Sequence, residues 1–386
     1  MINHLDKGDC CGCTACECIC AHEAITMQSD AFGFLYPVVD KDKCVDCGIC
    51  EKVCQFKEDY NRYQNFALPI IFGCRHKDNN ELSKSQSGAA SWGLIQSFLS
   101  EKGIVYGTAF ETVTHVVHKR AETIDECQAF RGSKYVQSDI RGIFPMVKKD
   151  LLNDERVLFF GTGCQIAGLK SFIPSRLHDK LYTVDIVCHA TPSPEFWKQY
   201  VEYYENKYHN KIIKASFRNK RFGWHSHVET FEFANGKEIV GNNILQKLFY
   251  DHLIVRRSCS NCYFTNLKRV SDITISDFWG WENYYEEWND NKGVSLMLIN
   301  SEKGKSLFSK AKEFLDYKKS DSSKCLQPQL IGPIILGEKA DKVERIFEKD
   351  GFKGVAKMFG FIGYKHQIKR LKYVFRLLRS KLFVKK

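Results

Sequence analysis

The sequence predicts a two-part protein, in which a small cysteine-rich α+β module precedes a larger α/β domain with a mixed sheet. Residues 1–58 hold two copies of the spacing Cys-x2-Cys-x2-Cys-x3-Cys. From Ile70 onward, short apolar segments alternate with amphipathic helical ones, which is typical of a layered α/β architecture. Segments 212–217 and 228–240 have the character of antiparallel strands, so the sheet is expected to be mixed.

The two cysteine runs predict a bacterial ferredoxin-like module with two [4Fe–4S] clusters. In such a module three thiolates of one loop bind one cluster, and the fourth cysteine of the run binds the other. We therefore assign Cys54 to the cluster of the first loop and Cys20 to that of the second. Each member of the second run lies 34 positions after its counterpart, and the members are Cys10, Cys13, Cys16, Cys20 and Cys44, Cys47, Cys50, Cys54.

Two zinc sites or a disulfide framework are the alternatives. Zinc loops usually pair cysteines across a long gap, which this run does not do. Ala21 and Gln55 stand where a proline often follows the fourth cysteine. Cys11 and Cys18 have no counterpart in the second run and are interpreted as thiols near a cluster, with Cys11 as an alternative to Cys10 for one iron.

Composition narrows the class of protein. At 386 residues and 44% hydrophobic residues, the chain is expected to fold into two or more packed domains. No run reaches the roughly 18 apolar residues of a membrane-spanning helix. A polar start indicates no signal peptide, and many cysteines without one indicate the reducing cytoplasm, where cysteine serves metal or redox chemistry.

The net charge of +11 is confined to the C-terminal segment. Residues 351–386 hold eleven Lys and Arg and no acid, so residues 1–350 are formally neutral, and no nucleic-acid partner is indicated. Within 365–386, five apolar residues form one helical stripe among basic ones: Leu371, Val374, Phe375, Leu378 and Leu382. We predict a tail that contacts the inner membrane surface, with a protein partner or packing on the body as alternatives.

The other expected elements follow in order. A hairpin is expected around 31–39, a linker at 59–69 and the larger domain at 70–350. Expected strands are 70–74, 104–110, 157–161, 182–188 and 273–278. Expected helices are 91–103, 165–173, 194–208 and 302–315.

Two strand–helix junctions have the composition of phosphate sites. They are SQSGAAS at 85–91 and GTGCQ at 161–165. Small residues at a helix N-terminus let free backbone N–H groups and the helix dipole bind an anion. Either junction by itself fits a tight turn with a serine cap better than a phosphate site.

Together these segments resemble the coenzyme F420 hydrogenase/dehydrogenase beta-subunit family. The resemblance covers about Ile70 to Leu315 and implies a flavin domain that binds FAD and passes electrons between iron–sulfur clusters and a second partner. That partner is coenzyme F420 in archaeal members. The motifs are SQSGAASWGL (85–94), RGSKYVQS (131–138), VLFFGTGCQIAGLKSF (157–172), DIVCHATPSPEFW (185–197), FRNKRFGW (217–224) and RSCSNCYF…SDITISDFWG (257–280).

By this resemblance, eight residues are flavin-pocket candidates: Ser87, Gly88, Lys134, Tyr135, Gln137, Gly161, Cys164 and Gln165. Ala89 and Gly163 depart from the family pattern by small changes that leave room for a pyrophosphate. The resulting hypothesis is an iron–sulfur flavoprotein oxidoreductase that serves a redox partner protein or a small-molecule electron acceptor. The alternative is a non-catalytic electron-transfer or scaffold subunit of a larger redox or biosynthetic complex that has lost the flavin.

Other cysteines and one histidine are further candidates. Cys259 and Cys262 form a C-x2-C pair, and with Cys164 and Cys188 at predicted strand ends they are candidate ligands of a third cluster or a metal. The alternative is that Cys164 and Cys188 are buried core residues. His189 follows a predicted strand, where it is expected to act as a proton donor or as a structural histidine. Substrate, use of coenzyme F420, direction of electron flow and oligomeric state do not follow from these residues.

Overall fold

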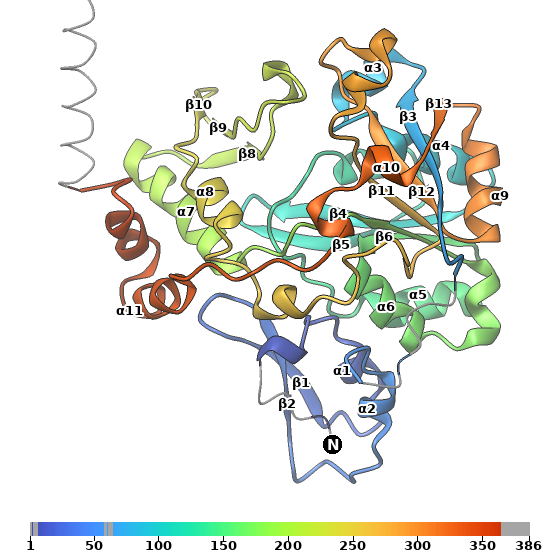
Figure 1. Cartoon of the computed structure of the whole chain (residues 1–386). Helices are drawn as coiled ribbons and strands as arrows, with labels where there is room; N and C mark the ends of the chain where they lie inside the picture. The colour runs from blue at the N-terminus through green and yellow to red at the C-terminus, as the bar shows by residue number, and fades with distance from the viewer. Residues whose placement is uncertain (1, 3–6, 58–59, 61–64, 364–386) are drawn as a thin grey trace, which may run out of the picture.

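The computed structural model describes residues 2, 7–57, 60 and 65–363. The chain forms a large α/β body with a small N-terminal module below it in Figure 1. The body is built on one large sheet and carries a smaller sheet at its side. This two-part arrangement confirms the fold class expected from the sequence.

The two cysteine runs fold alike. Each reaches a residue with left-handed backbone, Thr14 (φ 66°) or Gly48 (φ 70°), and then forms a five-residue helix. The helices are α1 (Ala15–Ile19) and α2 (Ile49–Val53), and each is followed at once by the last cysteine of its run. Between them lies the antiparallel hairpin of β1 (Ile25–Ser29) and β2 (Leu35–Val39), as expected around 31–39.

Within the described residues, the large sheet has eight strands in the order β13-β3-β12-β11-β7-β6-β4-β5. The middle strands β11, β7, β6 and β4 run parallel, and the flanking strands pair antiparallel. The strands are β3 (Ile70–His76), β4 (Ile104–Thr112), β5 (His115–Ala121), β6 (Val157–Thr162), β7 (Leu181–Ile186), β11 (Ile273–Asp277), β12 (Ser295–Ile299) and β13 (Leu315–Ser320).

Helices cover both faces of this sheet. Leu158 of β6 faces the core formed by α4 and α9, whereas Val157 and Phe159 face the core formed by α5 and α6. Runs that are apolar on both faces are what a strand buried between two helical layers requires. The longer helices are α4 (Ala90–Leu99), α5 (Ile143–Leu152), α6 (Gly163–Phe172), α7 (Pro194–Tyr208), α9 (Glu302–Ala311) and α11 (Ala340–Met358).

The remaining helices are short. They comprise α3 (Asn79–Lys84), α8 (Ile244–Tyr250), α10 (Ser322–Cys325) and 3-10 turns at Lys7–Asp9, Glu126–Phe130, Ser175–Lys180, Lys220–Phe222, Arg257–Asn261, Trp281–Asn283, Glu286–Trp288 and Pro328–Leu330.

Two expectations need correction. The strands expected at 212–217 and 228–240 do not join the large sheet but form their own antiparallel sheet of β8 (Ile212–Ser216), β9 (Thr230–Phe233) and β10 (Glu238–Val240). This sheet separates because Ile212, Phe231 and Phe233 pack with the aromatic face of α7. The helix expected at 302–315 ends at Ala311, since Leu315 begins β13 at the sheet edge.

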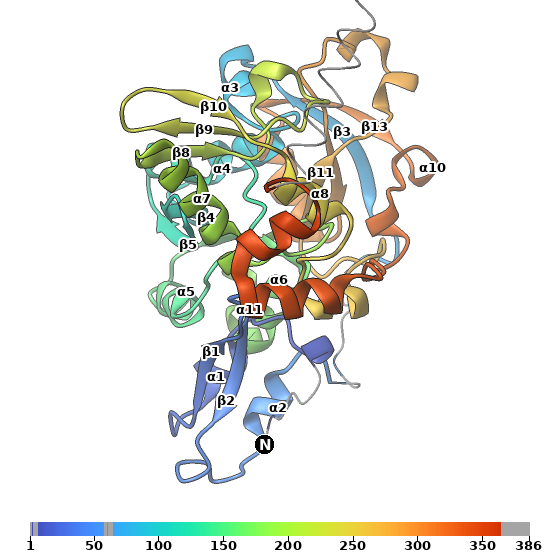
Figure 2. The same ribbon diagram turned by 90° about the vertical axis from the view of Figure 1, so that its left-hand side faces the viewer.

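The module is fixed tightly to the body through α6 (Figures 1 and 2). Ala15 and Val53 share a core with this helix. A Cβ atom at Gly168 would lie 2.6 Å from the Sγ of Cys13, so only glycine permits this approach. Ser171 of α6 also donates a hydrogen bond to the carbonyl oxygen of Val53 over 2.7 Å.

Helix α11 crosses the boundary expected at residue 350. The helix bends at Gly351 (φ 61°), and Phe352 beyond the bend is buried against α7. The predicted amphipathic stretch 365–386 lies outside the described residues. In the part of the chain that is described, no helix is both long and apolar enough to cross a membrane.

Candidate cofactor sites

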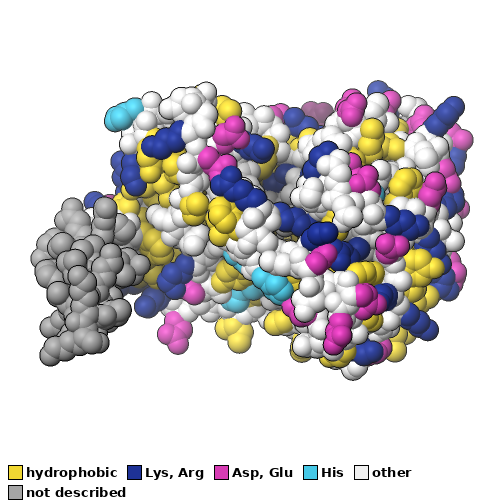
Figure 3. Space-filling model, turned by 90° about the horizontal axis from the view of Figure 1, so that it is seen from above, with side chains coloured by type: hydrophobic (Ala, Val, Ile, Leu, Met, Phe, Trp, Pro, Cys, Tyr) yellow, Lys and Arg dark blue, Asp and Glu magenta, His cyan; other side chains and the backbone are white. Residues whose placement is uncertain are grey.

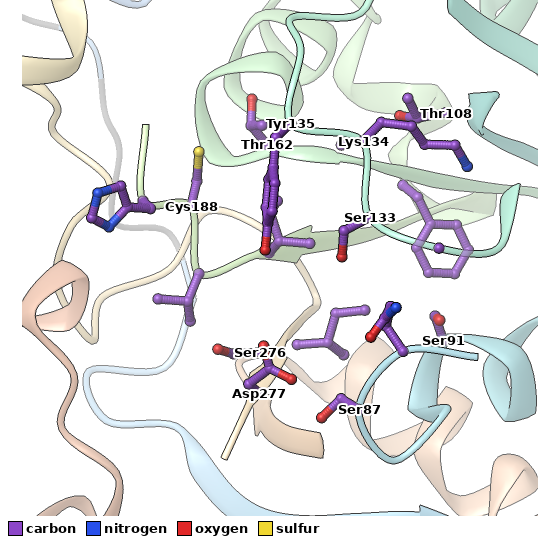
Figure 4. Close-up of a pocket in the computed structure, with 18 of the residues that line it drawn as sticks. Ser87, Ser91, Thr108, Ser133, Lys134, Tyr135, Thr162, Cys188, Ser276 and Asp277 are labelled. Atoms are coloured by element: carbon purple, nitrogen blue, oxygen red, sulfur yellow. The ribbon is translucent and has the colours of Figure 1, made fainter. Parts of the chain in front are cut away.

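The parallel strands β4, β6, β7 and β11 direct their carboxyl ends toward one cavity of about 420 Å³. Its wall includes Thr108, Thr162, Cys188 and Asp277, each on or just after one of these strands. Ligands of open α/β sheets bind at this end of the strands. The volume is typical of pockets that enclose a cofactor or a small molecule. We call this space the large cavity (Figure 4).

The predicted flavin-pocket residues come together here. Seven of the eight line the large cavity, namely Ser87, Lys134, Tyr135, Gln137, Gly161, Cys164 and Gln165. Gly88 lies directly behind, where a Cβ atom would come within 2.1 Å of the Cys74 carbonyl oxygen. In Figure 4, Ser87 and Ser91 lie across the cavity from Ser133 and Tyr135.

The loop before α4 forms one wall. The hydroxyl of Ser87 donates to the carbonyl oxygen of Val294 over 2.6 Å, and the backbone N–H of Gly88 donates to Ser295 over 3.0 Å. Lys220 donates to three carbonyl oxygens around this loop, those of Leu82, Ser85 and Ser87, at 2.6, 2.7 and 2.8 Å. The first residues of α4 therefore face the cavity in a fixed position, with backbone N–H groups at a helix N-terminus.

The opposite wall carries basic side chains. Burial lowers the pKa of Lys134 to about 7, and its ammonium group donates to the carbonyl oxygens of Ala129 and Arg131 at 3.0 Å. Arg131 pairs with Glu81 and stacks on the ring of Trp92. Seen from the side opposite the module, Lys and Arg side chains gather along a hollow between two lobes (Figure 3). An anionic ligand in the large cavity would meet complementary charge.

His189 also lines the large cavity, but the protein engages both of its ring nitrogens. Nδ1 accepts from the side-chain amide of Gln329 over 2.9 Å, and Nε2 lies 2.9 Å from Nε2 of His252. The other nitrogen of His252 faces the carbonyl oxygen of Ile335 at 2.8 Å, so that nitrogen is the donor of this bond. Burial and His252 lower the pKa of His189 to about 4. These bonds favour the structural alternative for this histidine.

A smaller cavity of about 40 Å³ lies beside the large one. Its lining contains Cys164, Cys188, Cys259 and Cys262, the four cysteines predicted for a third cluster, together with Cys11. Cys164, Cys188 and His189 line both cavities. Across the described ranges, no three His, Cys, Asp or Glu side chains gather tightly enough for a single metal ion. The four thiols share this one cavity, where a third cluster or a metal was expected from the sequence.

The module's cysteines lie in two neighbourhoods. Burial and the thiols of Cys10 and Cys54 raise the pKa of Cys16, which places Cys54 with the first loop. A cavity of about 100 Å³ is lined by the second set: Cys20, Cys44, Cys47 and Cys50. We call Cys10, Cys13, Cys16 and Cys54 the proximal set, because Cys13 touches α6, and the second set the distal set.

Sequence reasoning did not identify how Cys11 and Gln55 join the two parts. The amide of Gln55, where proline is usual, donates to Cys11 Sγ over 2.9 Å and to the carbonyl oxygen of Cys164 over 3.1 Å. Gln137 donates to the carbonyl oxygen of Cys11 over 2.9 Å. Cys11 therefore lies between the proximal set and the smaller cavity. In the sequence, the one indication of this role was that Cys11 has no counterpart in the second cysteine run.

Comparison with known families finds one match in the body and one in the N-terminal module. Residues 154–323 match the family described as the C terminus of the beta subunit of coenzyme F420 hydrogenase/dehydrogenase. Residues 37–57 match the 4Fe-4S binding domain. No curated protein matches the chain. Among solved structures, a chain of the xenon-derivatised F420-reducing [NiFe] hydrogenase complex from Methanosarcina barkeri aligns with a TM-score of 0.46 and 16% identity, over 77% of this chain and 91% of that chain.

The matches define an iron–sulfur protein with a 4Fe-4S binding domain in its N-terminal module. Over residues 154–323, the match to the C-terminal domain of the coenzyme F420 hydrogenase/dehydrogenase beta subunit confirms the resemblance seen in the motifs.

Proposed function

We propose that this protein is an iron–sulfur flavoprotein oxidoreductase. It would hold [4Fe–4S] clusters at the proximal and distal sets, a third cluster in the smaller cavity and FAD in the large cavity. The observation that carries the proposal is that the large and the smaller cavity share a wall. Cys164 and Cys188 line both cavities. A cluster bound there would lie next to the flavin.

The order of the thiols supports a continuous electron path. The distal set lies in the module beside the proximal set, and Cys11 connects the proximal loop to the smaller cavity. Gln55 holds this junction by bonding both Cys11 and Cys164. Each step therefore joins neighbouring sites, and no step has to cross the body of the protein.

The large cavity suits a dinucleotide with a pyrophosphate. Ala90 and Ser91 at the start of α4 line the cavity, and Lys134, once charged beside an anion, would offer positive charge to phosphate oxygens. Bound FAD would exchange electrons singly with clusters and in pairs with an organic substrate. An anion beside Lys134 would also raise its lowered pKa, so the lysine would be charged in the complex.

The alternative, a subunit that has lost its flavin, is less well supported. The departures at Ala89 and Gly163 leave a cavity of about 420 Å³, and no large side chain fills it. The substrate partner is proposed only as a redox protein or a small-molecule acceptor. A proton donor other than His189 is expected, because that ring is bonded on both sides.

Iron and flavin analysis of anaerobically purified protein tests the proposal. We expect about twelve irons and one FAD per chain, because three [4Fe–4S] clusters are proposed. Cys188→Ala should lower iron to about eight, while the matched control Cys127→Ala, a buried cysteine outside these cavities, should not. A chain with about four irons, or without flavin after gentle purification, would contradict the proposal.

A further inference from the structure

Arg256 is a fully enclosed cation between the cysteine module and the large cavity. Its side chain is 1% exposed. Nε donates to the carbonyl oxygen of Cys10 over 2.7 Å, and Nη2 donates to that of Leu35 over 2.7 Å. Nη2 also lies 3.6 Å from the sulfur of Cys10, and Nη1 lies 3.1 Å from Oε1 of Gln137. The guanidinium thus touches a predicted cluster ligand directly.

The charge of Arg256 is compensated differently from that of other buried arginines. Arg75, Arg218 and Arg269 are also buried in the described chain, and each contacts an aspartate: Asp290, Asp277 and Asp185 respectively. Among the described residues, the ionisable groups that act most on Arg256 are instead Cys10, Tyr36, Cys11 and Cys259, and none of these four is a carboxylate.

A buried guanidinium without a negative partner costs several kcal/mol. Carbonyl oxygens and the ring of Tyr36, whose centroid lies 4.3 Å from the guanidinium carbon, offset part of that cost. The missing negative charge would be supplied by a cluster on the proximal set, because four thiolates outweigh the positive charge of the iron–sulfur core. Arg256 therefore fits as the counter-ion of that cluster.

We propose that Arg256 raises the reduction potential of the proximal cluster. This inference rests on the proposed function, since it requires a [4Fe–4S] cluster at Cys10, Cys13, Cys16 and Cys54. Reduction adds one electron and no proton, so the cluster becomes more negative by one charge. A fixed cation with a hydrogen bond to the ligand sulfur stabilises this reduced form more than the oxidised form.

A higher potential at the proximal cluster sets the direction of electron transfer within the module. The distal set has no corresponding arginine contact among the described bonds to its sulfurs, where backbone N–H groups of Ile2 and Ala24 lie 3.4 Å from Cys50 and Cys20. With the proximal potential the higher of the two, an electron delivered to the distal cluster moves inward. Gln137 bonds both Arg256 and the Cys11 carbonyl, so the same arginine also fixes the proximal loop against the large cavity.

Redox titration followed by electron paramagnetic resonance tests this role. The variant Arg256→Met removes the charge, and Arg257→Met is the matched control, because the neighbouring Arg257 pairs with Asp341 and Glu344 instead. With dithionite as the electron source, we expect Arg256→Met to lower the ratio of reduced to oxidised proximal cluster at least tenfold at a given potential, a shift of ~59 mV for one electron. The distal signal and the Arg257→Met variant should not shift.

Two further variants keep the result decisive. If Arg256→Met does not retain iron, Arg256→Gln keeps an amide donor for the Cys10 carbonyl and should show the same downward shift. Arg256→Lys should return the potential toward that of the unmodified protein, and failure to do so contradicts an electrostatic role. An unchanged proximal potential in an iron-replete Arg256→Met or Arg256→Gln protein overturns the inference and leaves the proposed function intact. Fewer than about eight irons in the unmodified protein would instead contradict the proposed function.

Discussion

The ammonium group of Lys220 lies 2.8 Å from the carbonyl oxygen of Ser87, although the two residues are separated by 133 positions. This bond and two others to Leu82 and Ser85 join the small-sheet side of the body to the loop that opens α4. A single side chain thus holds the wall of the large cavity that is expected to face phosphate.

We predict that Lys220→Met weakens flavin retention. The variant leaves three carbonyl oxygens without their donor, at a cost of roughly 1–3 kcal/mol, and loosens the loop before α4. FAD affinity, measured by fluorescence during dialysis, should fall about tenfold or more. Arg221→Met is the control, because the neighbouring Arg221 forms its ion pair with Glu238 at the surface and is not bonded to this loop in the described contacts. Equal retention in both variants would show that the loop does not need Lys220.

The crossed assignment of the clusters is tested at Cys20. The distal cavity groups Cys20 with the second loop, so Cys20→Ser should remove or convert that cluster and lower iron by up to about four atoms. Cys18→Ser is the control, since Cys18 lies near Thr14 and outside that cavity. Iron analysis with resonance spectroscopy distinguishes the two. Loss of the proximal signal in Cys20→Ser would reverse the assignment.

Close packing at Gly168 predicts a strong effect of one methyl group. In Gly168→Ala the new Cβ would meet Cys13 Sγ at 2.6 Å, so α6 or the proximal loop must shift. We expect a loss of at least 1–3 kcal/mol in stability and lower proximal iron content. Gly332→Ala is the control, because nothing lies within 4 Å of a Cβ atom there. Thermal unfolding and iron analysis of both variants measure the difference.

Acid should destabilise the fold through His118. Burial lowers its pKa to about 4, whereas the unfolded chain has a value near 6.5. The unfolded state therefore binds more protons between these values, and stability that is full above about pH 6.5 declines as the pH falls toward 4. Between pH 7 and pH 5 we expect a loss of roughly 1–2 kcal/mol from this residue.

The measurement is the difference in thermal midpoint between pH 7 and pH 5, under anaerobic conditions. His118→Gln should reduce that difference, since its amide can still donate to the Phe160 carbonyl without titrating. Equal pH dependence in both proteins would assign the acid sensitivity to other groups, such as the clusters themselves.

Membrane contact through 365–386 is a separate prediction. Removal of this segment should release the protein from anionic liposomes without changing its cofactor content, and binding of the full chain should weaken with salt. Flotation with anionic and neutral vesicles measures this. Loss of cofactors on truncation would favour packing against the body instead.

The sequence by itself determined the local chemistry. The spacing of cysteines predicted the cluster loops, since ligands of one loop are arranged by a few backbone dihedrals that short spacers dictate. Alternation of apolar runs with amphipathic ones likewise predicted β6, α6 and their junction. Motifs near Ser87, Lys134 and Gly161 predicted a shared pocket only through resemblance, and the structure places these residues around one cavity.

Only the tertiary structure determined which residues distant in the sequence become neighbours. Cys164 in α6 and Cys259 in the turn Arg257–Asn261 are 95 positions apart, and both line the smaller cavity because the chain before β11 returns to the end of β6. Arg256 reaches Cys10 across 246 positions, and no local period encodes such a contact. Strand order and register depend on how complete faces are buried together, so residues joined by them cannot be identified from spacing along the chain.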